Sequence, residues 1–160
     1  MDELTGSSAR VASELKRLGL SAEVRVMPAS TRSAADAAGA IGCDIAQIVK
    51  SLIFRTVEKD EPVLVLASGA NRVDLARLGE IVADQVVQAD AAFVRARTGF
   101  AIGGVAPVGH LQPVATYFDK DLLQHDVVWA AAGSPSAVFP VAPVDLVRVT
   151  SAVVVVLAAP

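Results

Sequence analysis

Apolar positions recur along this chain with two different periods. Val11, Leu15 and Leu18 follow one another at helical spacing, which predicts a helix that Gly19 can end. Residues 22–26 alternate instead, with valines on one face and charged side chains on the other, which predicts a strand. Because helical and strand signals keep alternating to the C-terminus, we expect an α/β or α+β fold.

Residues 50–57 and 63–67 predict two strands joined by a hairpin-type connection. The second strand is apolar on both faces, so it should lie in the middle of a sheet that is covered on both sides. Further strands are expected at residues 114–118, 127–131, 137–141 and 152–160, with short helices beginning at residues 33 and 44 and spanning residues 74–78, 90–97 and 143–147. About seven strands with short helices between them predict a curved, partly closed mixed sheet, which we expect to form one domain over residues 1–160.

Composition supports a folded protein and narrows its partners. The 160 residues are 53% apolar and 19% charged, so a sizeable core can form. A net charge of −3 argues against a protein that coats DNA or RNA. It is compatible with a partner that binds only through its end, at one pocket. Cys43 is the single cysteine, so no internal disulfide can form and a cytoplasmic setting is expected. The acidic N-terminus lacks a signal core and the longest apolar run is too short to span a bilayer, so no membrane partner is expected.

Lys50 is the first candidate for a functional residue. On a strand it shares a face with Leu52 and Phe54, while Ser51 and Ile53 point the other way. Burying an ammonium without a partner is costly, so this lysine either extends into solvent at the strand end or lies in a polar pocket. In the second case it is a cation directed at a phosphate, a carboxylate or a carbonyl oxygen.

A glycine-rich stretch at residues 103–110 is the second candidate. Gly103, Gly104 and Gly109, with Pro107 between them, exclude regular helix or strand. Such a loop can form an anion- or oxyanion-binding concavity from successive N–H groups, or it can simply connect two elements. It matches neither a phosphate-binding P-loop nor a dinucleotide fingerprint. His110 at its end could act as a general base or serve a structural role.

The remaining polar features are weaker. Gly133 and Ser134 lie in a turn between two predicted strands, and Asn71 follows another strand. His110 and His125 stand apart from any cysteine or carboxylate at metal-ligand spacing, so no metal and no cofactor is expected. No serine, histidine and aspartate order typical of a catalytic triad is present.

Taken together, the order of these pieces resembles the YbaK/ProX family, the free-standing relatives of the editing domain inserted in bacterial prolyl-tRNA synthetases. The resemblance covers roughly residues 15–149. It rests on Ala34-Ala35 before a short helix, residues 47–54 around Lys50, Gly103-x-x-x-Pro107-x-Gly109-His110, and the Gly133 turn followed by Asp145-Leu146. It implies a mixed α/β fold on a curved, barrel-like sheet. It also implies a metal-free, trans-acting hydrolase that cleaves the ester joining a wrong amino acid to tRNA.

The resemblance also implies residue roles. Lys50 would hold the terminal adenosine and the aminoacyl group, and the loop from Gly103 to Pro107 would present N–H groups to the scissile carbonyl. The substrate's own ribose hydroxyl or side chain would assist the attacking water. We therefore expect Lys50, Gly103 and Gly104 to be catalytic. Substrate binding is expected at Pro107, Gly109, His110, Ser51, Gly133 and Ser134.

The expected partner is the acceptor end of a mischarged tRNA, with an aminoacyl-tRNA synthetase as a second candidate and no DNA. Phosphate contacts are expected at Arg10, Lys16, Arg17, Arg72, Arg95 and Arg97. Residues 137–140 are apolar where some relatives carry a polar residue, and Ser51 follows the lysine as in the free-standing subgroups. The main alternative is a non-catalytic module that binds tRNA or a synthetase, and a third is a hydrolase of a small ester. Alanine, serine, threonine and cysteine all remain open as the amino acid removed.

Overall fold

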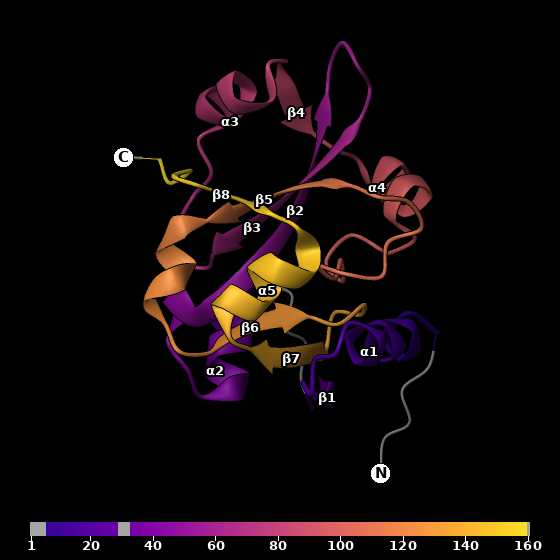
Figure 1. Cartoon of the computed structure of the whole chain (residues 1–160), viewed down its shortest axis with the longest axis vertical. Helices are drawn as coiled ribbons and strands as arrows, with labels where there is room; N and C mark the ends of the chain where they lie inside the picture. Colours follow the sequence, from indigo (N-terminus) through magenta and orange to yellow (C-terminus); the bar gives the residue numbers. More distant parts are fainter. Residues whose placement is uncertain (1–5, 29–32, 160) are drawn as a thin grey trace.

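The computed structural model describes residues 6–28 and 33–159 (Figure 1). The described helices are α1 (Gly6–Arg17), α2 (Ala34–Ile41), α3 (Leu75–Val82), α4 (Ala91–Thr98) and α5 (Pro143–Thr150), with 3₁₀ turns η1 (Ile45–Gln47) and η2 (Lys120–Gln124). The described strands are β1 (Arg25–Val26), β2 (Ile48–Thr56), β3 (Pro62–Ser68), β4 (Val86–Gln88), β5 (Ala115–Asp119), β6 (Val128–Ala131), β7 (Ala137–Val141) and β8 (Val153–Val155).

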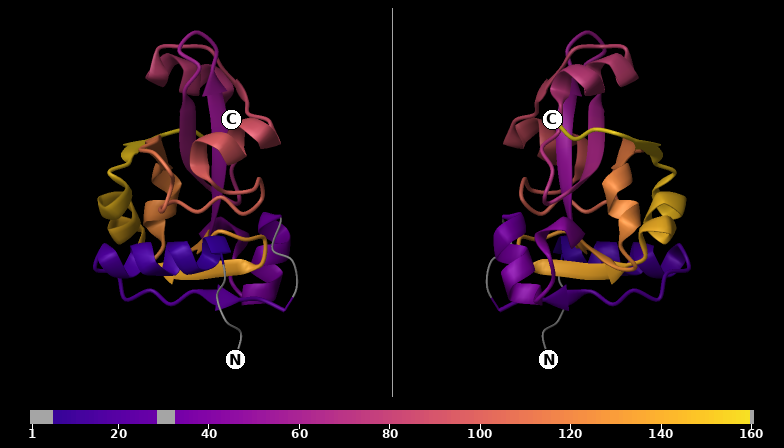
Figure 2. Two further views of the ribbon diagram at one scale, coloured as in Figure 1. Left: turned by 90° about the vertical axis from the view of Figure 1, so that its right-hand side faces the viewer. Right: turned by 90° about the vertical axis from the view of Figure 1, so that its left-hand side faces the viewer.

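All eight described strands belong to one mixed sheet in the order β1-β7-β6-β2-β3-β5-β8, with β4 attached to β2. The pairs β2–β6, β3–β5 and β5–β8 are parallel, and the other pairs are antiparallel. The long hairpin of β2 and β3 links the two ends of the molecule: α3 and β4 lie at its tip, and β1, β7, α1 and α2 lie at the opposite end (Figure 2). The predicted mixed α/β class with a partly closed sheet is confirmed.

Strand β2 is shared by two short partners on the side away from β3. β6 pairs with it at Ile48 and Val49, and β4 pairs with it at Phe54, Arg55 and Thr56. No described strand pairs with residues 50–53 on that side. The sheet therefore has a gap along the middle of its longest strand, and the candidate site lies there.

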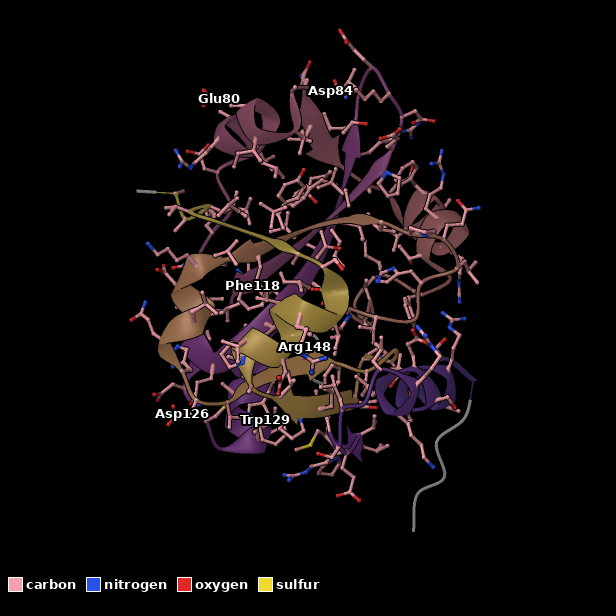
Figure 3. The ribbon with its side chains drawn as sticks, viewed as in Figure 1. Glu80, Asp84, Phe118, Asp126, Trp129 and Arg148 are labelled. Atoms are coloured by element: carbon pink, nitrogen blue, oxygen red, sulfur yellow. The ribbon has the colours of Figure 1, made fainter. Side chains whose placement is uncertain are left out.

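Two apolar cores cover the two faces of β2 and β3, as the alternation predicts. Val49 and Ile53 face a large core that includes Phe118, which Figure 3 shows in the interior. Phe54 faces a smaller core with Leu78 of α3. β3 contributes to both cores and is buried after its first residue, so its predicted central position is confirmed.

Helix starts also follow the sequence, because aspartate and serine caps act locally. Ser33 Oγ accepts from the Asp36 N–H at 3.0 Å, and Asp90 Oδ1 accepts from the Phe93 N–H at 2.8 Å. Asp74 caps α3 in the same way, but this helix continues to Val82, four residues further than predicted.

Some boundaries predicted from the sequence were wrong. The structure contains β4 and η2, which are too short to show a period. The C-terminal strand covers three residues rather than nine, because Leu157 turns into the smaller core and Ala158 forms an isolated bridge with Val73. In the part of the chain that is described, no helix is long and apolar enough to cross a membrane.

Candidate active site

A pocket of about 290 Å³ opens at the gap in the sheet. Its floor is the stretch of β2 from Lys50 to Ile53, and β4 and β6 contribute its sides through Gln88 and Ala131. The loop after α4 contributes the opposite wall through Ile102, Gly103 and Val105. A sheet gap facing a glycine-rich loop exposes main-chain groups to a ligand.

The unpaired part of β2 offers hydrogen-bonding groups to this pocket. The Ile48 carbonyl accepts from the Gly69 N–H at 2.7 Å, and the Thr56 N–H donates to the Glu61 carbonyl at 2.9 Å. Even-numbered residues of β2 thus direct their main-chain groups toward β3. Because these directions alternate along a strand, the N–H and C=O groups of Ser51 and the N–H of Ile53 point into the gap, while the Ile53 carbonyl faces the end of β4.

Lys50 lies half-buried at this pocket, near the start of β2. Its ammonium donates to the main-chain carbonyl of Asn71, in the loop after β3. Burial lowers the pKa of Lys50, the nearby charge of Asp119 opposes that effect, and Arg72 reinforces it. The ammonium therefore lies half-buried among polar groups of the loop after β3 and of β5.

Ser51 also lines the pocket. Ser51 Oγ is buried and has no hydrogen-bond partner within the described residues. A buried hydroxyl without a hydrogen-bond partner is energetically costly. The main chain of Ser51 faces the gap in the sheet.

Gly103 and Gly104 play different parts in the loop. Gly103 is exposed with φ +88°, a conformation that favours glycine, and a Cβ atom placed there would meet nothing within 4 Å. No described residue accepts a hydrogen bond from its N–H. Gly104 is buried, and its N–H donates to the Ala101 carbonyl at 3.0 Å. Of these two glycines, only Gly103 has an N–H that remains available at the pocket.

The Gly133–Ser134 turn supports the loop from behind. A Cβ atom on Gly104 would lie 2.9 Å from the Ser134 Cα atom, so only glycine allows this close approach. Gly133, with φ +94°, is equally tight against the main chain of Ser7 at the start of α1. Neither Gly133 nor Ser134 lines the pocket that contains Lys50.

The end of the loop faces a second hollow. Pro107, Gly109 and His110 line this hollow together with residues of α1, away from Lys50. Within the described residues, neither buried ring nitrogen of His110 makes a well-formed hydrogen bond, and Phe100 packs edge-on against the ring, 5.3 Å between centroids. Burial lowers the pKa of His110 to about 4, opposed by the Ala106 backbone and reinforced by the charge of Arg10. This histidine is therefore neutral at pH 7.

The structure thus divides the predicted site residues into three groups. Lys50, Ser51 and Gly103 meet at one pocket, and Gly104, Gly133 and Ser134 form its support. Pro107, Gly109 and His110 lie at the second hollow.

Sequence reasoning missed two features of the surroundings of Lys50. One is Asp119, a buried aspartate at the end of the apolar strand β5, and the other is the contact of Asn71 with Lys50. A carboxylate directly after a buried strand was the available signal for Asp119.

The described residues contain no group of three or more histidine, cysteine, aspartate or glutamate side chains placed to hold a metal ion. Cys43 is half-buried among apolar residues that include Trp129, which Figure 3 shows on β6. Burial, followed by the charge of Asp44, raises the pKa of its thiol. A raised pKa makes this thiol a poor nucleophile.

Comparison with known proteins places this chain in a family. The chain is 45% identical to a proposed trans-editing enzyme for prolyl-tRNA synthetase, whose crystal structure superposes with a TM-score of 0.93 over 99% of this chain and 100% of that one. A crystal structure of a hypothetical protein matches at 29% identity and a TM-score of 0.87, covering 94% of this chain and 99% of that one. The uncharacterized protein YwhH of Bacillus subtilis is 29% identical over 124 residues, 78% of each chain. The profile of the aminoacyl-tRNA editing domain matches residues 28–149, so this chain belongs to the aminoacyl-tRNA editing domain family.

Proposed function

We propose that this protein is a trans-acting aminoacyl-tRNA deacylase, which hydrolyses the ester of a mischarged tRNA. The observation that carries the proposal is that Lys50 and Gly103 line one pocket, which opens where no described strand pairs with the middle of β2. A cation, a loop N–H and a strand edge together can hold the aminoacyl-adenosine end of tRNA. We place this activity in the cytoplasm, where tRNA is charged.

In this proposal catalysis depends on positioning. Lys50 contacts the terminal adenosine and the aminoacyl group, and the Gly103 N–H donates to the carbonyl oxygen as negative charge develops on it. Water adds to the carbonyl carbon, the bond to the ribose oxygen breaks, and that oxygen takes up a proton. The products are a free amino acid and intact tRNA. The neutral, buried His110 faces the other hollow, so the attacking water is assisted by the substrate's ribose hydroxyl.

The second candidate function is a non-catalytic module that binds tRNA or a synthetase. It is favoured by the lack of a side chain placed as a general base at the described part of the pocket. The two candidates differ in one measurable property, because a binding module retains mischarged tRNA without releasing the amino acid.

The test is a panel of tRNAs charged with alanine, serine, threonine or cysteine, with correctly charged tRNAs as controls. We expect catalytic release of at least one of these small amino acids. Release should be unchanged by EDTA, because no described cluster of side chains is placed to hold a metal. Binding of these tRNAs without release of any amino acid would reject the deacylase and favour the binding module.

A further inference from the structure

Asp119 is a carboxylate placed where carboxylates are rarely tolerated. It ends β5 and is only 1% exposed. A buried charge is costly unless hydrogen bonds or an opposite charge compensate for it. The described residues give it no direct salt bridge, so its hydrogen bonds must explain its position.

Those hydrogen bonds join three segments of the chain. Asp119 Oδ2 accepts from the main-chain N–H of Ser68 at 3.0 Å and from Asn71 Nδ2 at 2.9 Å. Asp119 Oδ1 accepts from the Asp121 N–H at 3.0 Å. Because β3 and β5 are parallel, Ser68 and Asp119 lie side by side at the carboxyl ends of these strands. The same edge of the sheet receives the start of antiparallel β2, where Lys50 lies.

Asn71 connects this carboxylate to the pocket. Its side-chain amide donates to Asp119, while its main-chain carbonyl accepts from the Lys50 ammonium. The turn is held further by the Asn71 N–H, which donates to the Ser68 carbonyl at 2.9 Å. An unbroken path therefore runs from Asp119 through Asn71 to Lys50.

We propose that Asp119 is the positioning residue for Lys50: it fixes the turn whose Asn71 carbonyl holds the ammonium, and it supplies the negative charge that this half-buried cation needs. The charged groups that face Lys50 are Asp119 from β5 and Arg72 from the loop after β3. Asp119 favours the ammonium form of Lys50, and Arg72 and burial oppose it, so Asp119 compensates for both. The inference uses the proposed function only in treating Lys50 as a substrate contact.

Asp119 also caps η2, and this role alone would make it a purely structural residue. Asp119→Asn removes the charge and the capping bond to the Asp121 N–H, while the amide oxygen can keep both bonds at the Oδ2 position. The titration of Lys50 then separates the two roles, because loss of the cap alone lowers stability without changing the charge near Lys50. Asp121→Asn is the matched control. Asp121 also accepts from Asn71 Nδ2, at 2.8 Å, but it is exposed.

The first measurement is the titration of Lys50 in the whole protein, followed by NMR of its Cε resonance, with Lys59 as an internal reference. Asp119→Asn should lower the pKa of Lys50, and Asp121→Asn should change it less. This readout needs no substrate, so it tests the inference even if the proposed deacylase activity is absent. An unchanged Lys50 titration in a folded Asp119→Asn variant would overturn the inference.

The second measurement is deacylation, corrected for spontaneous ester hydrolysis at each pH. Asp119→Asn should lower kcat/KM roughly tenfold near pH 7.5. It should also move the alkaline fall of activity to lower pH, because Lys50 must carry its proton to act. Loss of activity with no shift of the pH profile would show that Asp119 acts only on stability.

Asn71→Ala covers the case in which Asp119→Asn does not fold. It keeps the carbonyl that holds Lys50 and removes the amide that ties this turn to Asp119. We expect a loss of deacylation about as large as that of Asp119→Asn, at nearly unchanged thermal stability. Wild-type activity in Asn71→Ala, together with an unchanged Lys50 titration, would contradict the proposed path. Wild-type activity in Lys50→Ala would instead contradict the proposed function. The titration of Lys50 would then still test the path from Asp119 through Asn71 to Lys50.

Discussion

Each end of the loop between α4 and β5 lies at a hollow that contains a titratable side chain, and the surroundings of these two side chains differ. At one end Lys50 faces Gly103 across an open pocket, keeps a carbonyl partner and lies near Asp119. At the other end His110 is packed against Phe100, near the cation Arg10, and its buried ring nitrogens make no well-formed hydrogen bond with the described residues. Burial lowers the pKa of both groups, and of the two, Lys50 is the one with a negative charge nearby among the described residues. A lowered pKa therefore does not by itself distinguish the proposed substrate contact from a packed ring.

The largest expected effect comes from altering the pocket end of the loop. Gly103→Val should reduce deacylation about a hundredfold to a thousandfold, since a β-branched residue at φ +88° distorts the loop and its methyl groups enter the pocket. His110→Ala should be much less damaging. Steady-state rates on one mischarged tRNA, with circular dichroism to confirm folding, test the order. An inactive His110→Ala with a nearly normal Gly103→Val would mean that a histidine base operates.

Gly109 offers a matched control for that experiment. It lies in the same loop with φ +81°, but at the His110 end, and a Cβ atom there meets only ordinary contacts, the nearest at 3.7 Å from Phe100. Gly103→Ala and Gly109→Ala therefore carry similar backbone strain. A selective loss of activity in Gly103→Ala would be due to the pocket, whereas equal losses would be due to strain.

Lys50→Ala should have the next largest effect, a loss of about ten- to a hundredfold in kcat/KM. The reason is the loss of one charge-assisted contact, worth about 1.5–3 kcal/mol. Lys59→Ala is the control, because Lys59 is exposed in the turn between β2 and β3. Activity of Lys50→Ala within twofold of wild type would remove Lys50 from the central role.

The sequence was sufficient for the features that depend on neighbouring residues. Alternation around Lys50 predicted which side chains of β2 share a face, and the serine and aspartate caps predicted three helix starts. Strand β4 was missed because three residues show no period. The correct predictions and the missed strand have the same cause, because periodicity and capping signals involve only residues close together in sequence.

The arrangement of the site depends on contacts between distant segments. Asn71 reaches Asp119 across 48 positions of sequence, and the burial of His110 depends on α1 and Phe100. Neither contact leaves a local pattern. The sequence could therefore identify Lys50 and His110 as candidate functional residues, but it could not show that they line different hollows.

The next prediction concerns stability at the His110 end. The folded-state pKa of about 4 lies below the ordinary value of about 6.5, so between these values the unfolded chain binds a proton that the folded chain does not. The contribution of His110 is present above about pH 6.5 and falls as the pH drops toward 4. It amounts to about 2 kcal/mol between pH 7.5 and pH 5.

Denaturant unfolding of wild type and His110→Gln at these two pH values measures this contribution. His110→Gln should lose less stability on acidification, by about 2 kcal/mol. His125→Gln controls for removal of a histidine elsewhere in the chain. Equal pH dependence in all three proteins would show that the ring of His110 is accessible to protons in the folded state.

The smallest expected effect concerns tRNA phosphates, and it also distinguishes the two ends of the loop. Of the six expected phosphate contacts, Arg17 is paired with Glu14, Arg97 with Asp60, and Arg10 has buried guanidinium nitrogens over Phe100.

Arg72, Arg95 and Lys16 remain exposed and without an ion pair among the described residues, and only Arg72 lies beside Lys50. If tRNA enters from the pocket end, Arg72→Ala should weaken binding a few-fold and reduce the slope of log affinity against log salt by about one. Lys16→Ala, in the last turn of α1, should change neither quantity. Binding measured over a range of salt concentrations decides between the two ends, and a larger effect of Lys16→Ala would mean that tRNA lies over α1 and the His110 hollow.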